Sequence, residues 1–233
     1  MSWTASSRTF ASAGLIAVLA GCAAQPRGVP LFSDDFADAR HWVLEDERPA
    51  RVVAREGVLD IDTPAGLTLW FKQRLEGPVE IEFEAAAISA GGANDQVSDL
   101  NVFWMARNAE GADPPYLAAR SGRFAMYDDL VTYYVGLGGN RNTTSRFRRY
   151  VGQPGNRPLL PEHDRTGPEV LLEPNRWQRI SLLAAGSRIE YRRDGRVLFR
   201  LDDAAPYTQG WFALRTTWSH LRVRNFKIRR PVE

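Results

Sequence analysis

The chain has 233 residues, and 30 Lys and Arg against 28 Asp and Glu leave a formal net charge of +2. This balance argues against a nucleic-acid-binding protein, because such proteins neutralise phosphates with a clear excess of basic residues. The single cysteine excludes a disulfide within the chain, so the fold depends on its hydrophobic core. The length suits one large β domain.

Residues 1–21 have the features of an export signal, because an apolar stretch at 10–20 is too short to span a bilayer. The stretch ends in Leu-Ala-Gly-Cys, which resembles the lipobox of bacterial lipoproteins. The resemblance implies cleavage before Cys22, whose diacylglycerol anchor then attaches the protein stably to a membrane. We expect a tether at 22–30 and a location in the cell envelope, at the outer membrane or facing the periplasm. An ordinary signal peptide with an incidental cysteine is the alternative.

Most of the remaining chain alternates apolar and polar residues with the period of a β-strand. Residues 78–84 alternate apolar residues with Glu80, Glu82 and Glu84, which is typical of a half-buried strand. Residues 187–201 predict a β-hairpin, because Asp194-Gly195 supplies the positive φ angles of a type I′ turn. Further strands are predicted at 58–62, 67–73, 99–107, 130–137, 177–184, 211–216 and 220–229, with one short helical turn at 114–119. Many short strands separated by turns indicate one antiparallel β-sandwich domain at 31–230.

Two sets of motifs resemble known proteins. The opening LFSDDF at 31–36, followed by Trp42, and the closing segments at 210–216 and 219–226 are similar to the first and last strands of concanavalin A-like jelly rolls. VSDLNVFWMA at 97–106 and YVGLGGNRNTTSRF at 134–147 resemble a family of exported bacterial proteins of unassigned function. Members of that family tend to belong to polysaccharide-degradation systems. The resemblance implies an all-β sandwich of two curved antiparallel sheets whose concave face holds a sugar chain, and it supplies no catalytic residues.

The segment 138–157 is rich in arginine and has no acidic residue. It contains Arg141, Arg146, Arg148, Arg149 and Arg157, and no Asp or Glu occurs from 130 to 161. Guanidinium groups bind carboxylate or sulfate in bidentate geometry. Strand alternation after Thr144 places Arg146 and Arg148 on one face. With Asn140 nearby, the segment favours a binding site for an acidic sugar, although arginine that merely supplies surface charge would have the same composition.

Other polar and aromatic residues are candidates for the same site. Asn101 shares a strand face with Asp99, and its amide could neutralise a uronate carboxylate, while Trp104 could stack on a pyranose ring. A buried Asp99 that ties two loops together is the structural alternative. Arg215 and His220 open onto the groove if the last strand belongs to the concave sheet.

Two adjacent tyrosines, Tyr133 and Tyr134, point to opposite faces of their strand, so only one of them can face a cleft. Nearby arginines would lower the pKa of such a hydroxyl and make it a proton donor or acceptor. Packing between the sheets is the alternative role for both.

These residues favour a lyase that acts on an acidic, uronate-containing polysaccharide or oligosaccharide by β-elimination. Arg146, Arg148 and Asn101 would bind the carboxylate, His220 would remove the C5 proton, and Tyr133 or Tyr134 would protonate the leaving oxygen. A non-catalytic carbohydrate-binding lipoprotein is the first alternative. A glycoside hydrolase is the second, because the acidic triplet on residues 80–84 resembles the spacing used by retaining glycosidases of this superfamily.

No cofactor is expected. Three scattered histidines and one cysteine argue against zinc, and His41 and His163 are expected at the surface. Asp34 and Asp35 could contribute to a structural calcium site, although calcium needs six or more oxygens. We expect a monomer that binds an acidic saccharide and no nucleic acid.

Overall fold

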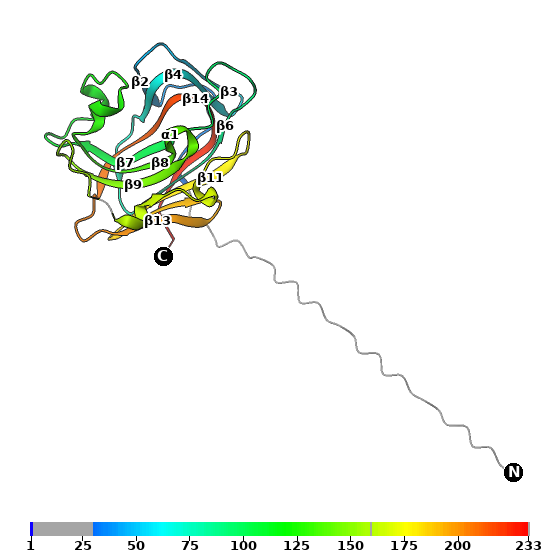
Figure 1. The fold of residues 1–233 in the computed structure, drawn as a ribbon. Coiled ribbons are helices and arrows are strands. Elements are labelled where there is room, and N and C mark those ends of the chain that lie inside the picture. The colour runs from blue at the N-terminus through cyan, green and yellow to red at the C-terminus, as the bar shows by residue number, and fades with distance from the viewer. Residues whose placement is uncertain (2–29, 159, 233) are drawn as a thin grey trace.

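The computed structural model describes Met1 and residues 30–158 and 160–232 (Figure 1). Apart from Met1, the predicted signal peptide lies outside these ranges, as do Cys22 and all but the last residue of the predicted tether, so the lipid anchor stays a prediction. Within the described ranges, no helix has the length and apolar character needed to cross a bilayer.

The described chain is built almost entirely from antiparallel strands. They are β1 (Pro30–Asp34), β2 (Trp42–Asp46), β3 (Arg51–Arg55), β4 (Val58–Phe71), β5 (Leu75–Glu76), β6 (Val79–Ala87), β7 (Leu100–Asn108), β8 (Leu130–Gly138), β9 (Thr144–Val151), β10 (Asp164–Arg165), β11 (Gln178–Ala185), β12 (Arg188–Arg193), β13 (Arg196–Asp202) and β14 (Gln209–Arg229). Short helical turns are η1 (Pro115–Leu117), η2 (Phe124–Tyr127), α1 (Gly139–Asn142), η3 (Pro161–His163) and η4 (Pro168–Val170).

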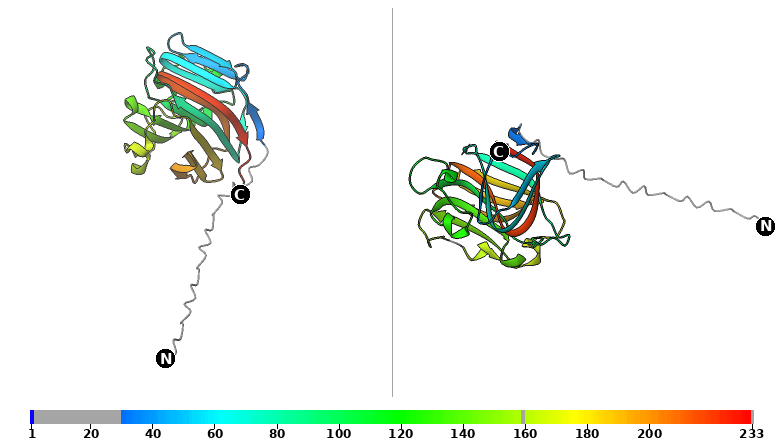
Figure 2. Two further views of the ribbon diagram at one scale, coloured as in Figure 1. Left: turned by 90° about the vertical axis from the view of Figure 1, so that its right-hand side faces the viewer. Right: turned by 90° about the horizontal axis from the view of Figure 1, so that it is seen from above.

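Two long strands, β4 and β14, run through both layers of the sandwich. The first half of β14 pairs with β7 and its second half with β6, while β4 follows it along the opposite edge. The first layer therefore has the order β10-β9-β8-β7-β14-β4-β2, and the second has β13-β12-β11-β6-β14-β4-β3. Figure 2 shows the red end of β14 beside the cyan β4. The predicted all-β sandwich of two curved antiparallel sheets is confirmed.

The main core lies between the two layers. Val79, Ile81 and Phe83 of β6 point into it, as the alternating sequence predicts. From the first layer, Phe147 meets Phe199 of the second at a ring-centroid distance of 6.4 Å. A second apolar cluster, which includes Trp70, Phe103, Tyr127, Tyr134 and Trp211, lies outside the main core. Part of the first layer's outer face is thus covered with aromatic rings.

Several sequence predictions of local structure are confirmed, and others need correction. The hairpin turn has positive φ angles at Asp194 (50°) and Gly195 (81°), and η1 lies within the helical turn predicted at 114–119. The strands predicted at 58–62 and 67–73 form one strand, β4, and those at 211–216 and 220–229 form β14. The alternation breaks where these strands bend from one layer to the other, which made each look like two strands.

His163 is buried, which contradicts the surface position expected for it. Its Nε2 lies 2.9 Å from the backbone oxygen of Arg200, and its ring packs 4.7 Å from that of Phe147. The polar residues around it in the sequence turn outward, while η3 directs the imidazole into the core.

Candidate functional site

A row of directly opposed residues crosses the outer face of the first layer. Arg215 of β14 pairs with Asn101 of β7, Asn101 pairs with Gly136 of β8, and Gly136 pairs with Arg146 of β9. Residues opposite each other in neighbouring strands present their side chains on the same face. At Gly136 the row has no side chain, and a Cβ there would lie 2.7 Å from the Tyr134 hydroxyl and 3.3 Å from Asn101 Oδ1. The glycine therefore leaves a hollow with arginine on either side.

A pocket of about 350 Å³ lies over this row, and we call it the arginine pocket. Its polar lining includes Asn101, Asn140, Arg146, Arg148, Arg157 and Arg215, together with the carboxylates of Glu47 and Asp99. Aromatic rings of Phe124, Tyr134 and Tyr150 form another part of the wall. The fold thus brings together Asn101, Tyr134, Asn140, Arg146, Arg148 and Arg215, all predicted as site residues, from β7, β8, α1, β9 and β14.

Arg215 is a buried cation that forms no ion pair with any carboxylate in the described part of the chain. Only 3% of the residue is exposed, and its Nη1 donates to Thr68 Oγ1 (2.9 Å) and to the backbone oxygen of Gly122 (2.8 Å). Phe124 and Tyr127 pack against the guanidinium. Their ring centroids lie 4.9 and 5.0 Å from the guanidinium carbon of Arg215. Among the described residues, no carboxylate forms an ion pair with it.

Burial is the main influence on Arg215 and lowers its pKa, although nearby Tyr127, Tyr134 and Asp99 oppose this shift. An arginine nevertheless stays protonated in proteins. A buried charge that lacks a partner destabilises a protein, and perturbed charges of this kind cluster at functional sites.

Four of the five arginines in the predicted binding segment, 138–157, do have acidic partners. Asp164 of β10 lies 3.4 Å from Arg146 Nε and 2.6 Å from Arg148 Nη2. Asp128 pairs with Arg157 at 2.5 Å, and Asp203 pairs with Arg149 at 2.7 Å. The absence of acidic residues from 130 to 161 therefore did not mean an absence of counter-charges, because Asp164 of β10 and the loop residues Asp128 and Asp203 supply them. Among the described residues, Arg141 of this segment and the buried Arg215 outside it form no ion pair with a carboxylate.

Two buried acceptors in the arginine pocket have no hydrogen-bond partner within the described protein: Asn101 Oδ1 and the Tyr150 hydroxyl. The Asn101 amide nitrogen donates to Asp99 Oδ1 at 3.2 Å. Burial raises the pKa of Asp99, against the lowering influence of Ser98, Asn101 and Arg215. The pocket therefore combines an unpaired cation, unpaired oxygens and a carboxyl group that ionises less readily than usual.

The two predicted acid tyrosines lie on opposite faces, as expected. Tyr134 lines the arginine pocket, whereas Tyr133 is buried in the main core, where its hydroxyl donates to Asp203 at 2.7 Å. Burial raises the pKa of both hydroxyls, so the expected lowering by nearby arginines is wrong. Desolvation disfavours the phenolate more strongly than the neighbouring guanidinium groups favour it.

Trp104 also lies in the main core and does not face the pocket. Its ring packs 5.5 Å from Tyr133 and 5.9 Å from Phe147. Because Phe103 precedes it on β7, strand alternation directs Phe103 toward the outer face and Trp104 inward.

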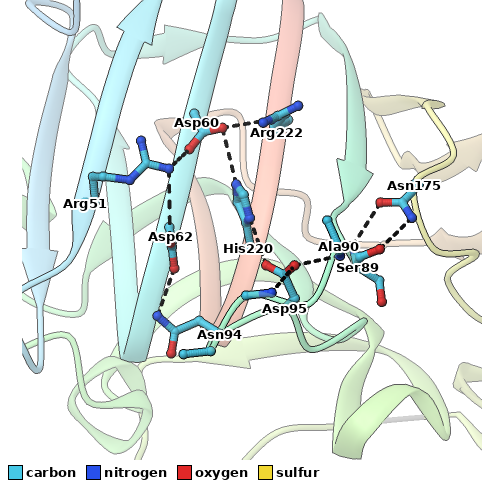
Figure 3. Close-up of polar contacts among 12 residues, drawn as sticks. Arg51, Asp60, Asp62, Ser89, Ala90, Asn94, Asp95, Asn175, His220 and Arg222 are labelled. Atoms are coloured by element: carbon cyan, nitrogen blue, oxygen red, sulfur yellow. Dashed lines mark hydrogen bonds and ion pairs between the residues drawn. The ribbon is translucent and has the colours of Figure 1, made fainter.

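His220 belongs to a different cluster, on the outer face of the second half of β14 (Figure 3). Its Nδ1 lies 2.9 Å from Asp95 Oδ1 and its Nε2 lies 3.2 Å from Asp60 Oδ2. Asp60 also accepts hydrogen bonds from Arg51 (2.5 Å) and Arg222 (2.8 Å). We call Arg51, Asp60, Asp95, His220 and Arg222 the histidine cluster. The structure does not bring His220 to the lining of the arginine pocket.

The carboxylates of the histidine cluster are well stabilised. Burial opposes their ionisation, but hydrogen bonds from Arg222 and His220 lower the pKa of Asp60 below its ordinary value. Backbone N–H groups of Ala90 and Gly92, together with His220, likewise lower the pKa of Asp95. Each ring nitrogen of His220 therefore lies within hydrogen-bond distance of a carboxylate oxygen.

The acidic triplet lies on the outer face of the second layer, away from the arginine pocket. Glu80 accepts a hydrogen bond from Ser181 at 2.5 Å, and Glu84 accepts one from Arg224 at 2.7 Å. At the proposed calcium position, Asp34 accepts from the backbone of Phe36 (2.8 Å) and from the Trp42 indole (2.9 Å). Within the described residues, no three His, Cys, Asp or Glu side chains are grouped so that they could hold a metal ion.

Sequence reasoning missed Gly136 and Tyr150 as parts of the site. A glycine inside an otherwise regular strand indicates a bulge or a close approach, and the Gly136 position carried that pattern. The unpaired state of Arg215 had no comparable pattern, because it depends on which residues neighbour it in space.

Comparisons with known proteins agree with this fold. Residues 61–226 match the family described as "Domain of unknown function (DUF6250)", and no curated protein matches the chain. A protein of unknown function with a galectin-like fold from Bacillus subtilis is similar, with a TM-score of 0.69 at 15% identity over 89% of this chain and 99% of that chain. The carbohydrate binding module CBM66 from Bacillus subtilis has a TM-score of 0.54 at 10% identity over 81% and 95% of the two chains. The carbohydrate recognition domain of Emp46p, metal-free form, has a TM-score of 0.55 at 13% identity over 88% and 95%. The protein therefore belongs to the DUF6250 family, with a concanavalin A-like and galectin-like jelly-roll fold.

Proposed function

We propose that the arginine pocket binds an acidic saccharide and that Arg215 binds its carboxylate. The observation that carries this proposal is the buried guanidinium of Arg215, which has no acidic partner among the described residues and whose Nε and Nη2 make no hydrogen bond there. A bound carboxylate would supply the missing counter-charge, with the charge-assisted geometry that guanidinium groups favour.

The rest of the pocket fits the hydroxyl groups of a sugar. Asn101 Oδ1 and the Tyr150 hydroxyl are buried and unpaired, and sugar hydroxyls would donate to them. A volume of about 350 Å³ is within the range of small-ligand sites. CBM66 from Bacillus subtilis is a carbohydrate binding module, and the similar domain of Emp46p is a carbohydrate recognition domain. These likenesses support a carbohydrate ligand, and Arg215 narrows the proposal to an acidic one.

The experiment is titration calorimetry with oligogalacturonides and with neutral galactose oligomers of the same length. We expect the wild-type protein to prefer the acidic oligomers, and Arg215→Met to weaken their binding about 100-fold, the order expected for losing a buried charge-assisted contact. Arg188→Met is the matched control, because Arg188 is an exposed arginine on β12 outside the pocket. Equal affinity for neutral and acidic oligomers, or full binding by Arg215→Met, would refute the proposal.

A second candidate is β-elimination at a bound uronate, and the position of Asp99 favours it. Asp99 and Tyr134 line the same pocket as Arg215 and Asn101, and burial raises the pKa of the Asp99 carboxyl. A carboxylate with a raised pKa is a stronger base. In this reaction Asp99 takes the C5 proton, the C5–H electron pair forms the C4=C5 double bond, the C4–O4 bond breaks, and Tyr134 protonates O4. Asp99 thus replaces His220 as the proposed base.

Formation of the unsaturated product is followed by its absorbance. We expect Asp99→Asn to abolish product formation while binding is retained. If wild-type protein forms no product from polygalacturonate or alginate, the elimination reaction fails and the binding function remains.

We also propose that a lipid anchor at Cys22 holds this domain in the cell envelope. The lipobox-like sequence supports the proposal. Membrane fractionation of the full chain tests it, because Cys22→Ser should move the protein from the membrane fraction to the soluble fraction. An unchanged distribution would exclude lipidation at this cysteine.

A further inference from the structure

An exposed tryptophan stands directly beside the arginine pocket. Thr217 lines the pocket, and the next residue along β14 is Trp218, which is 42% exposed. The other tryptophans that the structure describes are less exposed, and most belong to the apolar clusters. Trp218 is therefore the most exposed of the described tryptophans, and it follows a residue that lines the pocket.

The backbone at Trp218 is held in an unfavourable conformation. Its φ angle is +43°, and the pairing register between β14 and β4 shifts between Thr217 and Ser219. A positive φ angle is rare for a bulky residue, and bulges of this kind re-aim side chains near functional sites. Strain that persists in a structure is commonly associated with function. The bulge places the indole ring outside the sheet, beside the pocket.

A second strained segment brings a cation to the same ring. In α1 the residues Asn140, Arg141 and Asn142 have φ angles of 54°, 58° and 59°. Asn142 fixes this turn, because its side chain donates to the Leu172 carbonyl (2.9 Å) and accepts from the Leu172 amide (2.8 Å). The Arg141 guanidinium carbon then lies 6.0 Å from the centroid of the Trp218 ring.

Arg141 also lacks an acidic partner among the described residues, and Asn140 beside it lines the arginine pocket. The unpaired charge and the exposed ring therefore occur together at one edge of the pocket.

The indole nitrogen makes a further contact. The Trp218 indole nitrogen donates to the backbone oxygen of Ala93 at 3.4 Å. The loop that carries Ala93 is fastened by the Asp95–His220 hydrogen bond and by the two bonds between Asn175 and Ser89 (Figure 3). The position of the indole is therefore fixed before any ligand binds.

We infer that Trp218 and Arg141 form a second subsite, in which Trp218 stacks on the next sugar ring of an acidic chain and Arg141 binds its carboxylate. The apolar C–H face of a pyranose packs against an aromatic ring, and a guanidinium beside that ring selects a uronate over a neutral sugar. This inference rests on the proposed function and extends it. The ligand is a uronate oligomer that extends from the arginine pocket across Trp218. A single uronic acid would fill only the arginine pocket, which is the first subsite.

The test compares galacturonic acid with its tetramer by titration calorimetry. We expect the wild-type protein to bind the tetramer more tightly than the monomer. Trp218→Asn, which tolerates the positive φ angle, should weaken tetramer binding about tenfold and leave monomer binding unchanged. Trp218→Phe keeps an aromatic face and should retain most of the tetramer affinity. Leu117→Asn, at an exposed residue (65%) on η1 outside the pocket lining, is the matched control.

The outcomes separate this inference from the proposed function. If Arg215→Met abolishes binding while Trp218→Asn binds the tetramer as well as wild type, the second subsite is refuted and the pocket stands. If the wild-type protein binds monomer and tetramer equally, the second subsite is also refuted. If Arg215→Met binds both ligands normally, the pocket and the subsite are both refuted. Thermal melts of each variant check that the fold is intact.

Discussion

The arginine pocket and the histidine cluster lie on the same face of β4 and β14, but they differ in whether their charged side chains form ion pairs. Thr68 and Arg215 belong to the pocket region, while Asp60 and His220 lie further along the same two strands. Arg215 has no acidic partner in the described chain, whereas His220 lies between two carboxylates, and one of these also binds two arginines.

This difference assigns the two regions different roles. A fully paired cluster satisfies its own charges and fastens a loop to the sheet. A buried cation without a partner destabilises the protein and is complementary to an anion that comes from outside. The sequence made His220 the more attractive candidate, because histidine commonly serves as a base. Its surroundings now favour a structural role, and Arg215 takes the central place in the site.

The largest effect should come from breaking the paired cluster. His220→Ala leaves Asp60 and Asp95 without their shared donor, so we expect the free energy of unfolding to fall by about 3 kcal/mol at neutral pH. Urea unfolding followed by tryptophan fluorescence measures this loss. Affinity for monomeric galacturonic acid should stay unchanged. A fully stable variant that no longer binds the monomer would reverse the roles given to the two regions.

Filling the hollow of the pocket should have the next largest effect. Gly136→Ala introduces a Cβ 2.7 Å from the Tyr134 hydroxyl and 3.3 Å from Asn101 Oδ1. We expect affinity for oligogalacturonides to fall about tenfold, which corresponds to about 1.4 kcal/mol. Gly77→Ala is the control, because a Cβ at Gly77 would lie no closer than 3.4 Å to its nearest neighbour, the backbone oxygen of Thr208. Unchanged affinity in Gly136→Ala would show that the ligand does not enter this hollow.

Replacing the unpaired cation should affect stability less than breaking the paired cluster. Arg215→Met keeps much of the side-chain volume and removes a desolvated charge, so we expect the free energy of unfolding to change by less than about 1 kcal/mol. The two lost hydrogen bonds, to Thr68 and Gly122, offset part of the gain. Thermal and urea unfolding measure the difference from wild type. A loss as large as that of His220→Ala would show that Arg215 is primarily structural.

The smallest effects should appear in the pH dependence, with opposite signs in the two regions. The pKa of Asp95 is lowered from 3.8, so this residue contributes stability above that pH and loses it as the pH falls through the lowered value. The pKa of Asp99 is raised from 3.8, so its contribution is present below that pH and is lost as the pH rises through the raised value.

Variants at the two positions make this contrast measurable. At pH 7, Asp95→Asn should therefore be less stable than wild type, and Asp99→Asn should be as stable or slightly more stable. Urea unfolding between pH 2 and pH 8 compares the variants. A destabilised Asp99→Asn at pH 7 would contradict the conclusion that burial in the pocket disfavours ionised Asp99.

Much of the fold followed from patterns that are local in the sequence. Alternation in residues 78–84 and the Asp194-Gly195 turn correctly predicted a strand and a hairpin. The same alternation placed Arg146 and Arg148 on one face, and both line the pocket. These predictions succeed because side-chain direction in a strand, and φ in a tight turn, depend on neighbouring residues.

The composition of the site depended on contacts between residues far apart in the chain. Asp164 neutralises Arg146 and Arg148, and the bulge at Trp218 shifts the alternation so that His220 returns to the outer face. A one-residue shift reverses the direction of every later side chain of a strand. No local pattern in the sequence predicted the bulge at Trp218. The sequence by itself determined the all-β architecture and the supply of arginine and asparagine. The tertiary structure decided which arginines form ion pairs, because their counter-charges come from residues distant in the sequence.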